Sequence, residues 1–130
     1  MKRYLLDTHI IVWALTQPRK LSPRTMAVLQ TEAVYVSALS LWEILTKQQR
    51  GRLHLGDRSL VQHATRAGAH WLAMTAEHVE SGLALDGLHG DPFDRILVGT
   101  ARVEQMILLT RDAQILDLAA PLLGPLLQEA

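Results

Sequence analysis

Four acidic residues occupy positions from which their carboxylates can act together. Asp7 directly follows an apolar run at residues 4–6, and Asp112 lies two positions after a second apolar run that ends at Thr110. Glu43 lies early in one predicted helix, and Asp94 lies in the first turn of another. In an open parallel sheet, ligands bind beyond the carboxyl ends of the strands, where helix N-termini converge. The sequence therefore predicts that the four acids share one cleft.

Four ionised carboxylates at close range repel one another unless protons or cations neutralise them. Oxygen ligands without a Cys or His requirement favour Mg²⁺ or Mn²⁺ over zinc. Such a site suits phosphodiester hydrolysis, because a metal can activate water and offset the charge of the leaving oxygen. The hydroxyls of Thr8, Ser37 and Thr110 are expected to hydrogen-bond the carboxylates or bound water.

Ordinary structural roles are open for several of these acids. Asp91 precedes a proline, so it is a good N-cap, and Asp94 three residues later could complete a capping box. The run from Ser40 to Glu43 also matches a capping box, and Asp112 could complement the dipole of its helix. Asp7 is harder to explain in this way, because apolar neighbours make an unpaired acid costly.

Other polar and aromatic residues near the predicted cleft have two readings. Arg95, next to Asp94, is a candidate for contact with phosphate or for a structural ion pair. His9 and His89 lie beside the predicted cleft, where a role towards substrate is open to either. The tryptophans lie in apolar surroundings and are interpreted as core or interface residues rather than base-stacking platforms; they are Trp13, Trp42 and Trp71.

The elements that must position these residues alternate between strands and helices. Short apolar runs predict strands buried on both faces of a parallel sheet, at residues 4–6, 33–36, 71–73 and 106–110. Helices are predicted between them, at residues 23–30, 39–49, 59–67, from 91 onwards and at 111–118. A short edge strand is predicted at residues 122–127. This alternation indicates an α/β fold with a doubly wound sheet.

Composition limits the remaining possibilities. The 130 residues, 48% of them hydrophobic, suit a single independently folding domain spanning residues 1–130. The 13 basic and 13 acidic residues cancel, so any case for nucleic acid rests on a local site. The absence of cysteine excludes a disulfide scaffold and agrees with a reducing, cytoplasmic setting. No apolar run approaches the roughly 18 residues of a membrane span, so no membrane association is expected.

Four segments together resemble a known family. They are Leu5-Leu6-Asp7-Thr8-His9 with Trp13; Val36-Ser37-Ala38-Leu39-Ser40-Leu41-Trp42-Glu43-Ile44; His89-Gly90-Asp91-Pro92-Phe93-Asp94-Arg95; and Leu109-Thr110-Arg111-Asp112. In order and spacing they are similar to VapC-type PIN domains along nearly the whole chain. Each segment alone is weak, because short acid-bearing motifs occur by chance, but the set is specific.

The resemblance implies a PIN-like three-layer α/β/α fold with a central parallel sheet of about five strands. It implies an endoribonuclease that depends on Mg²⁺ or Mn²⁺, with Asp7, Glu43, Asp94 and Asp112 as catalytic and metal-binding acids and Asp91 as an accessory acid. It also implies the toxin of a type II toxin–antitoxin pair, which cleaves cellular RNA and is held in check by a VapB-like antitoxin. Homodimers are common in the family, and here the apolar surface would come from helices around residues 60–85.

Other functions remain open at this point. A PIN nuclease acting on DNA or in RNA maturation would have the same fold and acids. A non-cleaving module that binds RNA or a protein would keep its affinity without the acids. A phosphoacceptor domain of the receiver type also uses acids at strand ends, but it would need a lysine near the site, and no lysine follows Lys47.

Overall fold

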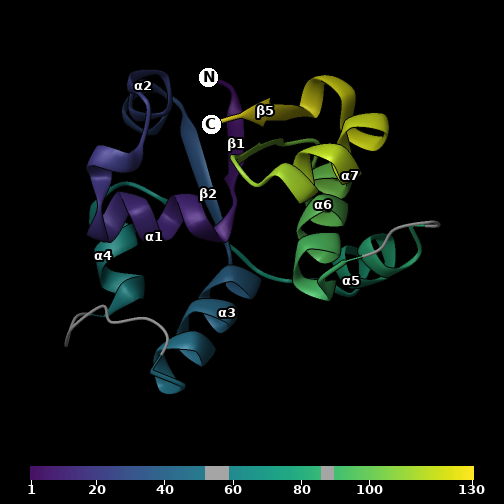
Figure 1. Ribbon diagram of the computed structural model, residues 1–130, viewed down its shortest axis with the longest axis horizontal. Coiled ribbons are helices and arrows are strands. Elements are labelled where there is room, and N and C mark those ends of the chain that lie inside the picture. Colours follow the sequence, from purple (N-terminus) through teal and green to yellow (C-terminus); the bar gives the residue numbers. More distant parts are fainter. Residues whose placement is uncertain (52–58, 86–89) are drawn as a thin grey trace.

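The computed structural model describes residues 1–51, 59–85 and 90–130. Within these ranges the chain forms a sheet of five parallel strands in the order β3-β2-β1-β4-β5 (Figure 1). The strands are β1 (Arg3–Leu6), β2 (Ala33–Ser37), β3 (His70–Leu72), β4 (Ile107–Thr110) and β5 (Leu127–Glu129). The prediction of a parallel sheet of about five strands is confirmed.

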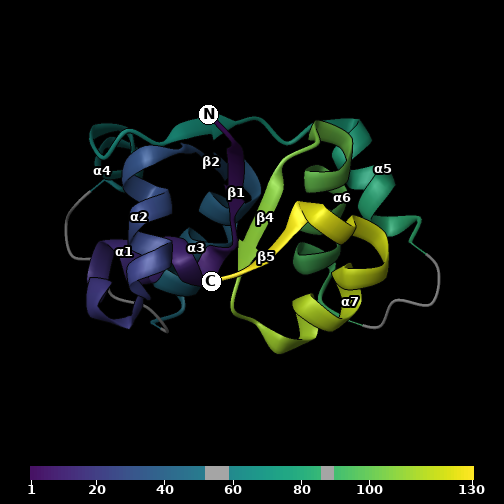
Figure 2. The ribbon, with the colours of Figure 1, turned by 90° about the horizontal axis from the view of Figure 1, so that it is seen from above.

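Helices cover both faces of this sheet. Figure 2 shows α1, α2 and α4 on one side and α6 and α7 on the other, with α5 outside α6. The helices are α1 (Thr8–Thr16), α2 (Pro23–Thr31), α3 (Ala38–Gln49), α4 (Leu60–Arg66), α5 (Ala76–Leu83), α6 (Pro92–Glu104) and α7 (Ala113–Leu123), with short 3-10 turns at Pro18–Lys20 and Gly124–Leu126. This is the predicted three-layer α/β/α arrangement. No helix in the described ranges is long and apolar enough to cross a membrane.

Strand β1 supplies side chains to two separate cores. Tyr4 and Leu6 join the core beneath α1, α2 and α4, whereas Leu5 joins the core beneath α6 and α7. Successive side chains of a strand point to opposite faces, so an uninterrupted apolar run is what a central strand needs. Leu5 is fully buried, and this placement fixes where β1 ends and therefore where Asp7 emerges.

The chain changes direction in the sheet between β1 and β4. From β1 it proceeds outward through β2 to β3, then returns to the other side of β1 to form β4 and β5. The backbone N–H of Asp7 donates to the carbonyl of Leu109 at 3.0 Å, so pairing continues one residue past β1. Crevices at such switch points are where open α/β sheets bind ligands.

Three elements differ from the sequence predictions, and one of them is α5 (Ala76–Leu83), for which no helix range was predicted. The segment around residues 10–13, to which no conformation was assigned, is the buried part of α1, with Ile10 and Ile11 in the core. The predicted C-terminal edge strand exists as β5, but its predicted bounds of 122–127 are wrong, because α7 continues through Pro121 to Leu123 and β5 begins only at Leu127. Burial of Ile115, Ala119 and Leu123 along one face of α7 outweighs the helix-breaking tendency of the proline.

Helices α5 and α6 are in backbone contact through two glycines. A Cβ added to Gly82 would lie 2.5 Å from the Cα of Ile96, and one added to Gly99 would meet the backbone nitrogen of Gly82. Neither site has room for a side chain, so both positions require glycine for close approach. The contact fixes the placement of α6, which carries Asp94 in its first turn.

Polar groups hold the same two helices together away from the glycines. His78 on α5 is fully buried, and its Nδ1 accepts a hydrogen bond from the backbone N–H of Thr75 at 3.1 Å. Its Nε2 is therefore the protonated nitrogen, and it lies 2.7 Å from the Glu104 carboxylate on α6. This charge-assisted contact orients one end of the helix pair.

Candidate active site at the switch point

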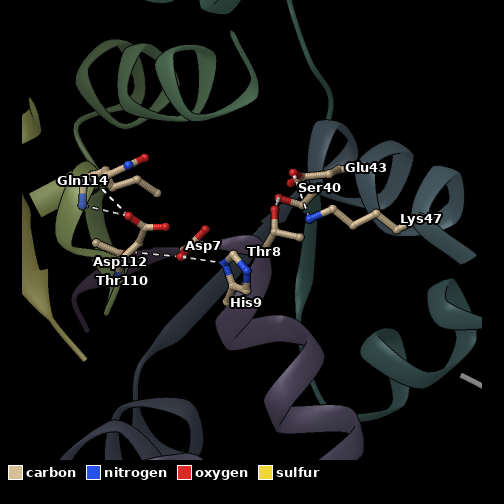
Figure 3. Close-up of polar contacts among 10 residues, drawn as sticks. Asp7, Thr8, His9, Ser40, Glu43, Lys47, Thr110, Asp112 and Gln114 are labelled. Carbon is tan, nitrogen blue, oxygen red and sulfur yellow. Dashed lines mark hydrogen bonds and ion pairs between the residues drawn. The ribbon is translucent and has the colours of Figure 1, made fainter. Parts of the chain in front are cut away.

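Asp7 is the most buried acid of the site. It lies between β1 and α1 with only 2% of its surface exposed. Its Oδ2 accepts a hydrogen bond from the Thr110 hydroxyl at 2.9 Å and lies 3.8 Å from Nδ1 of His9 (Figure 3). The contact with the Asp7 carboxylate raises the pKa of His9, although burial acts in the opposite direction.

Asp112 begins the helix that follows β4. Its Oδ1 accepts hydrogen bonds from the backbone N–H groups of Gln114 at 2.8 Å and Ile115 at 3.2 Å, so Asp112 is the N-cap of α7. The backbone N–H of Asp112 in turn donates to the Thr110 hydroxyl at 3.1 Å. Thr110 is thus bonded to both acids, as the predicted hydroxyl contact requires, and it fixes their relative position.

Glu43 approaches the site from α3, in the second turn of that helix. Its side chain is 14% exposed, and Oε2 lies 3.4 Å from Nζ of Lys47 one turn later. The capping box suggested for Ser40 and Glu43 does not form, because α3 begins earlier and Ser37 caps it through the N–H of Leu39. Glu43 is therefore free of a capping role.

The hydroxyls of Thr8 and Ser40 join the start of α1 to α3. Thr8 Oγ1 donates to Ser40 Oγ at 3.0 Å, and both residues are buried. Of the three hydroxyl residues expected to bond the acids, only Thr110 does so among the described contacts, whereas Ser37 caps α3 and Thr8 bonds Ser40. Figure 3 shows this link between the Asp7 and Glu43 sides of the site.

The charge of every other acid of the site affects the pKa of Asp94. Burial raises the pKa of its carboxyl to about 7, and four neighbouring charges add to the effect, namely those of Asp91, Asp7, Glu43 and Asp112. A carboxyl is raised this far when its charged form is desolvated and surrounded by like charge. The structure therefore brings the four predicted acids into one electrostatic cluster.

The residues on either side of Asp94 have structural contacts. Asp91 Oδ1 accepts from the backbone N–H of Phe93 at 2.7 Å and caps α6. The Arg95 guanidinium donates through Nη2 to the carbonyl of Leu83, the last residue of α5, at 2.7 Å and to that of Leu85, two residues further on, at 3.2 Å. Arg95 therefore ties α6 to α5, and in the described part of the chain it makes no ion pair.

Comparison with known proteins places this site in a family. Residues 4–121 match the PIN domain. The chain belongs to the PIN domain family. This PIN domain is 28% identical over 127 residues to Ribonuclease VapC22 of Mycobacterium tuberculosis, an alignment that covers 88% of the chain and 91% of the relative.

Solved structures share the fold of this PIN domain. A toxin–antitoxin complex from Klebsiella pneumoniae superposes with a TM-score of 0.66 at 15% identity, over 96% of this chain and 95% of the other. DNA-bound VapBC from Salmonella typhimurium gives a TM-score of 0.68 at 13% identity, over 99% and 98% of the two chains. At these identities the likeness is one of fold.

The acids of this PIN domain fit a hard divalent cation by charge and chemistry. Burial and the surrounding carboxylates raise the pKa of Asp94 to about 7. A cation would relieve the repulsion between these carboxylates. In the described ranges, no three acidic or histidine side chains are gathered closely enough to enclose an ion. Mg²⁺ commonly keeps several waters and uses one or two carboxylates together with substrate phosphates, so the open arrangement suits it.

Sequence reasoning missed one side of the site. A cavity of about 220 Å³ is lined by His9, Trp13, Arg111 and Asp112. Trp13 packs against the core, as predicted, but it is only partly buried and also lines this cavity, one helical turn after His9 on α1. Assigning residues 8–16 to a helix would have revealed the spacing. His89, the other histidine expected beside the cleft, lies outside the described residues.

Proposed function

We propose that this PIN domain is an endoribonuclease dependent on Mg²⁺ or Mn²⁺, acting as the toxin of a type II toxin–antitoxin pair. The observation that carries the proposal is the coupling of Asp94 to Asp7, Glu43 and Asp112 at the sheet's switch point. The charges of these acids raise the pKa of Asp94, and a bound cation would relieve the repulsion between them. The named relative, a ribonuclease, supports RNA as the polymer.

In this proposal each acid has a distinct position from which to act. Asp7 and Asp112 are held rigidly through Thr110, so their free oxygens present fixed negative charge at the rim. Glu43 and Asp94 approach from α3 and α6, so they would complete the site from two further elements. The four acids would hold the divalent ion either directly or through its bound waters. When bound, it would supply Lewis-acid polarisation of the phosphate and a more acidic water.

Partners and location extend the proposal. The VapBC complex and the toxin–antitoxin complex that share the fold support a VapB-like antitoxin as the binding partner. We also propose a cytoplasmic location, where the RNA substrate is found. A homodimer is part of the same proposal, but α4 and α5 lie at opposite ends of the molecule, so residues 60–85 do not form one continuous surface (Figures 1 and 2). Val61 and Leu83, exposed on these two helices, would belong to different interfaces.

The deciding experiment is incubation of total cellular RNA with the purified protein and Mg²⁺ or Mn²⁺, beside a chelated sample. Asp94→Asn is the test variant, and Asp117→Asn, which alters an exposed acid of α7, is the matched control. Discrete fragments are expected with wild type and Asp117→Asn, and none with chelator or Asp94→Asn. Intact RNA in every lane would favour a binding module, and faster cleavage of DNA would favour a different nuclease.

A further inference from the structure

The cavity beside Asp112 has the composition of a nucleotide site. We propose that it binds the nucleotide adjacent to the cleaved phosphate, with the base stacked on Trp13 and the neighbouring phosphate contacted by Arg111 and Lys20. The inference rests on the proposed ribonuclease function and adds Trp13 to it as a residue that binds a base of the RNA. His9 and Asp112, which also line the cavity, connect it directly to the acid cluster.

Three separate elements converge on the Trp13 ring. Trp13 itself lies on α1, and the guanidinium carbon of Arg111, from the β4–α7 connection, is 5.1 Å from its ring centroid. Nζ of Lys20, from the 3-10 turn Pro18–Lys20, is 5.5 Å from the same ring. The His9 ring lies 6.1 Å away and is tilted by 47°. Cation–π contacts of this kind fix the indole at the cavity wall.

The size of the cavity restricts its occupant. At about 220 Å³ it is smaller than the ~300 Å³ at which pockets for drug-sized ligands begin, so it suits one planar group. An indole wall offers stacking to any nucleobase, because every base has a π face. Stacking would require the Arg111 and Lys20 cations to move from the Trp13 ring to the neighbouring phosphate. A single base entering beside Asp112 would place its phosphodiester next to the acids.

Charge gives a second, independent reason. A polyanion approaching an acid cluster is repelled, and the chain as a whole has no net charge to offset this. Arg111 and Lys20 are exposed, and among the described residues neither is in an ion pair, so their charges are available to phosphates. The cavity is thus the place at this rim where an aromatic face and two available cations adjoin a candidate catalytic acid.

Trp42 provides an instructive contrast. It is 57% exposed and meets Phe93 edge to face, with ring centroids 5.2 Å apart. Among the described residues, no cation lies over the ring of Trp42, whereas two lie over that of Trp13. Exposure of a tryptophan alone therefore does not indicate that it stacks on a base. The combination of a cavity and two cations around Trp13 does.

The test is equilibrium binding in chelator, which separates binding from cleavage. Two fluorescein-labelled probes are compared by anisotropy: a single-stranded RNA hexamer, and a ribose-phosphate hexamer of the same length without bases. Wild type is expected to prefer the RNA by about tenfold, the effect of one stacked base. Trp13→Leu should bind both probes alike, Trp13→Phe should retain most of the preference, and Trp71→Leu, on the far strand β3, should behave as wild type.

Arg111→Gln tests the phosphate contact without touching the core, since Arg111 is exposed. Loss of one phosphate contact lowers the slope of log affinity against log salt by about 0.7 for single-stranded RNA. The base preference should remain in this variant, because Trp13 is intact and Lys20 still contacts its ring. The two variants therefore separate stacking from charge, and Arg111→Gln stays informative if Trp13→Leu fails to fold.

The outcomes distinguish this proposal from that of ribonuclease activity. If wild type cleaves RNA, but Trp13→Leu keeps the base preference and Arg111→Gln keeps the salt slope, only the nucleotide site is overturned. If Trp13→Leu loses the base preference but wild type never cleaves RNA, the nucleotide site is upheld and the proposed ribonuclease activity is overturned. Failure of folded wild type to distinguish the two hexamers would also overturn the site.

Discussion

The Thr110 hydroxyl is bonded to the two acids that flank the switch point. It donates to Asp7 at 2.9 Å and accepts from the N–H of Asp112 at 3.1 Å, and it is fully buried. A buried carboxylate that loses its donor has no water to replace it. Precise placement of Asp7 therefore depends on a residue that carries no charge.

Thr110→Val should remove both hydrogen bonds while preserving side-chain shape. We expect the free energy of unfolding to fall by about 1–3 kcal/mol, because Asp7 is left buried without its donor. RNA cleavage should fall with it. Urea unfolding and cleavage rates measure the two effects, and Thr110→Ser, which keeps the hydroxyl, is the control. A valine variant with wild-type stability and rate would show that the hydroxyl is dispensable.

The pKa of Asp94, raised to about 7 by burial and the surrounding acids, predicts a pH-dependent stability. The folded state holds this proton more tightly than the unfolded chain, whose Asp pKa lies near 3.8. The stabilising contribution is therefore complete below about pH 4 and is lost as pH rises through 7. Without metal, Asp94→Asn should melt at a higher temperature than wild type at pH 8, and the difference should shrink at pH 5.

Thermal melts of the two proteins in chelator measure this directly. Asp117→Asn is again the matched control and should follow wild type at both pH values. A constant difference between wild type and Asp94→Asn from pH 5 to pH 8 would contradict the raised pKa. Because the same substitution is expected to abolish cleavage, Asp94 would be a residue at which activity costs stability.

At the scale of elements, α6 carries Asp94 and is placed by α5. Arg95 bonds the carbonyls at the end of α5, and the Gly82–Gly99 contact brings the two backbones together. The N-terminus of α6 therefore cannot shift without disturbing α5. This coupling links a packing contact remote from the acids to the position of one of them.

Gly99→Ala should separate the two helices. The added methyl would meet the backbone of Gly82, which cannot yield as a flexible side chain does. We expect a loss of about 1–3 kcal/mol in the free energy of unfolding, typical of overpacking, and a lower cleavage rate. Denaturant unfolding measures the first effect, and Arg102→Ala, on the exposed surface of α6, is the control. Unchanged stability in Gly99→Ala would mean that α5 moves freely relative to α6.

The success of sequence reasoning varied with the kind of element. Strands buried on both faces have uninterrupted apolar runs, so β1, β2 and β4 were located to within about one residue of their ends. In α1, the apolar run Ile10-Ile11-Val12-Trp13 conceals helical periodicity because it continues around the helix. The helix predicted to end at residue 118 continues past Pro121 to Leu123 in α7, because tertiary packing overrides the low helix propensity of proline.

At the scale of the whole molecule, divalent ions should stabilise this protein. A ligand that binds only the folded state raises stability in proportion to the logarithm of its concentration over the dissociation constant. Adding Mg²⁺ or Mn²⁺ at pH 8 should raise the melting temperature of wild type and have a much smaller effect on Asp94→Asn. Equal shifts in the two proteins would place the ion elsewhere.

The topology explains why the acids could be grouped from sequence, whereas the Trp13 cavity could not. Carboxyl ends of parallel strands share one edge, so residues that follow strands meet there regardless of their separation along the chain. The cavity instead needs the orientation of one face of α1 and the Lys20 turn, neither of which a strand pattern specifies. Likewise, Arg95 was considered for phosphate because its neighbour is an acid, while its bonds to α5 arise only from helix packing.

The last strand of the sheet has a practical consequence. Strand β5 runs parallel to β4 with Glu129 beside Thr110, and the N–H of Ala130 donates to the Thr110 carbonyl at 2.8 Å. A fluorophore attached at Ala130 would therefore lie at the carboxyl ends of the strands, where the acids are. One attached at Met1 would lie at the opposite ends of the strands. Paired labels at the two positions would tell which edge an incoming molecule approaches first.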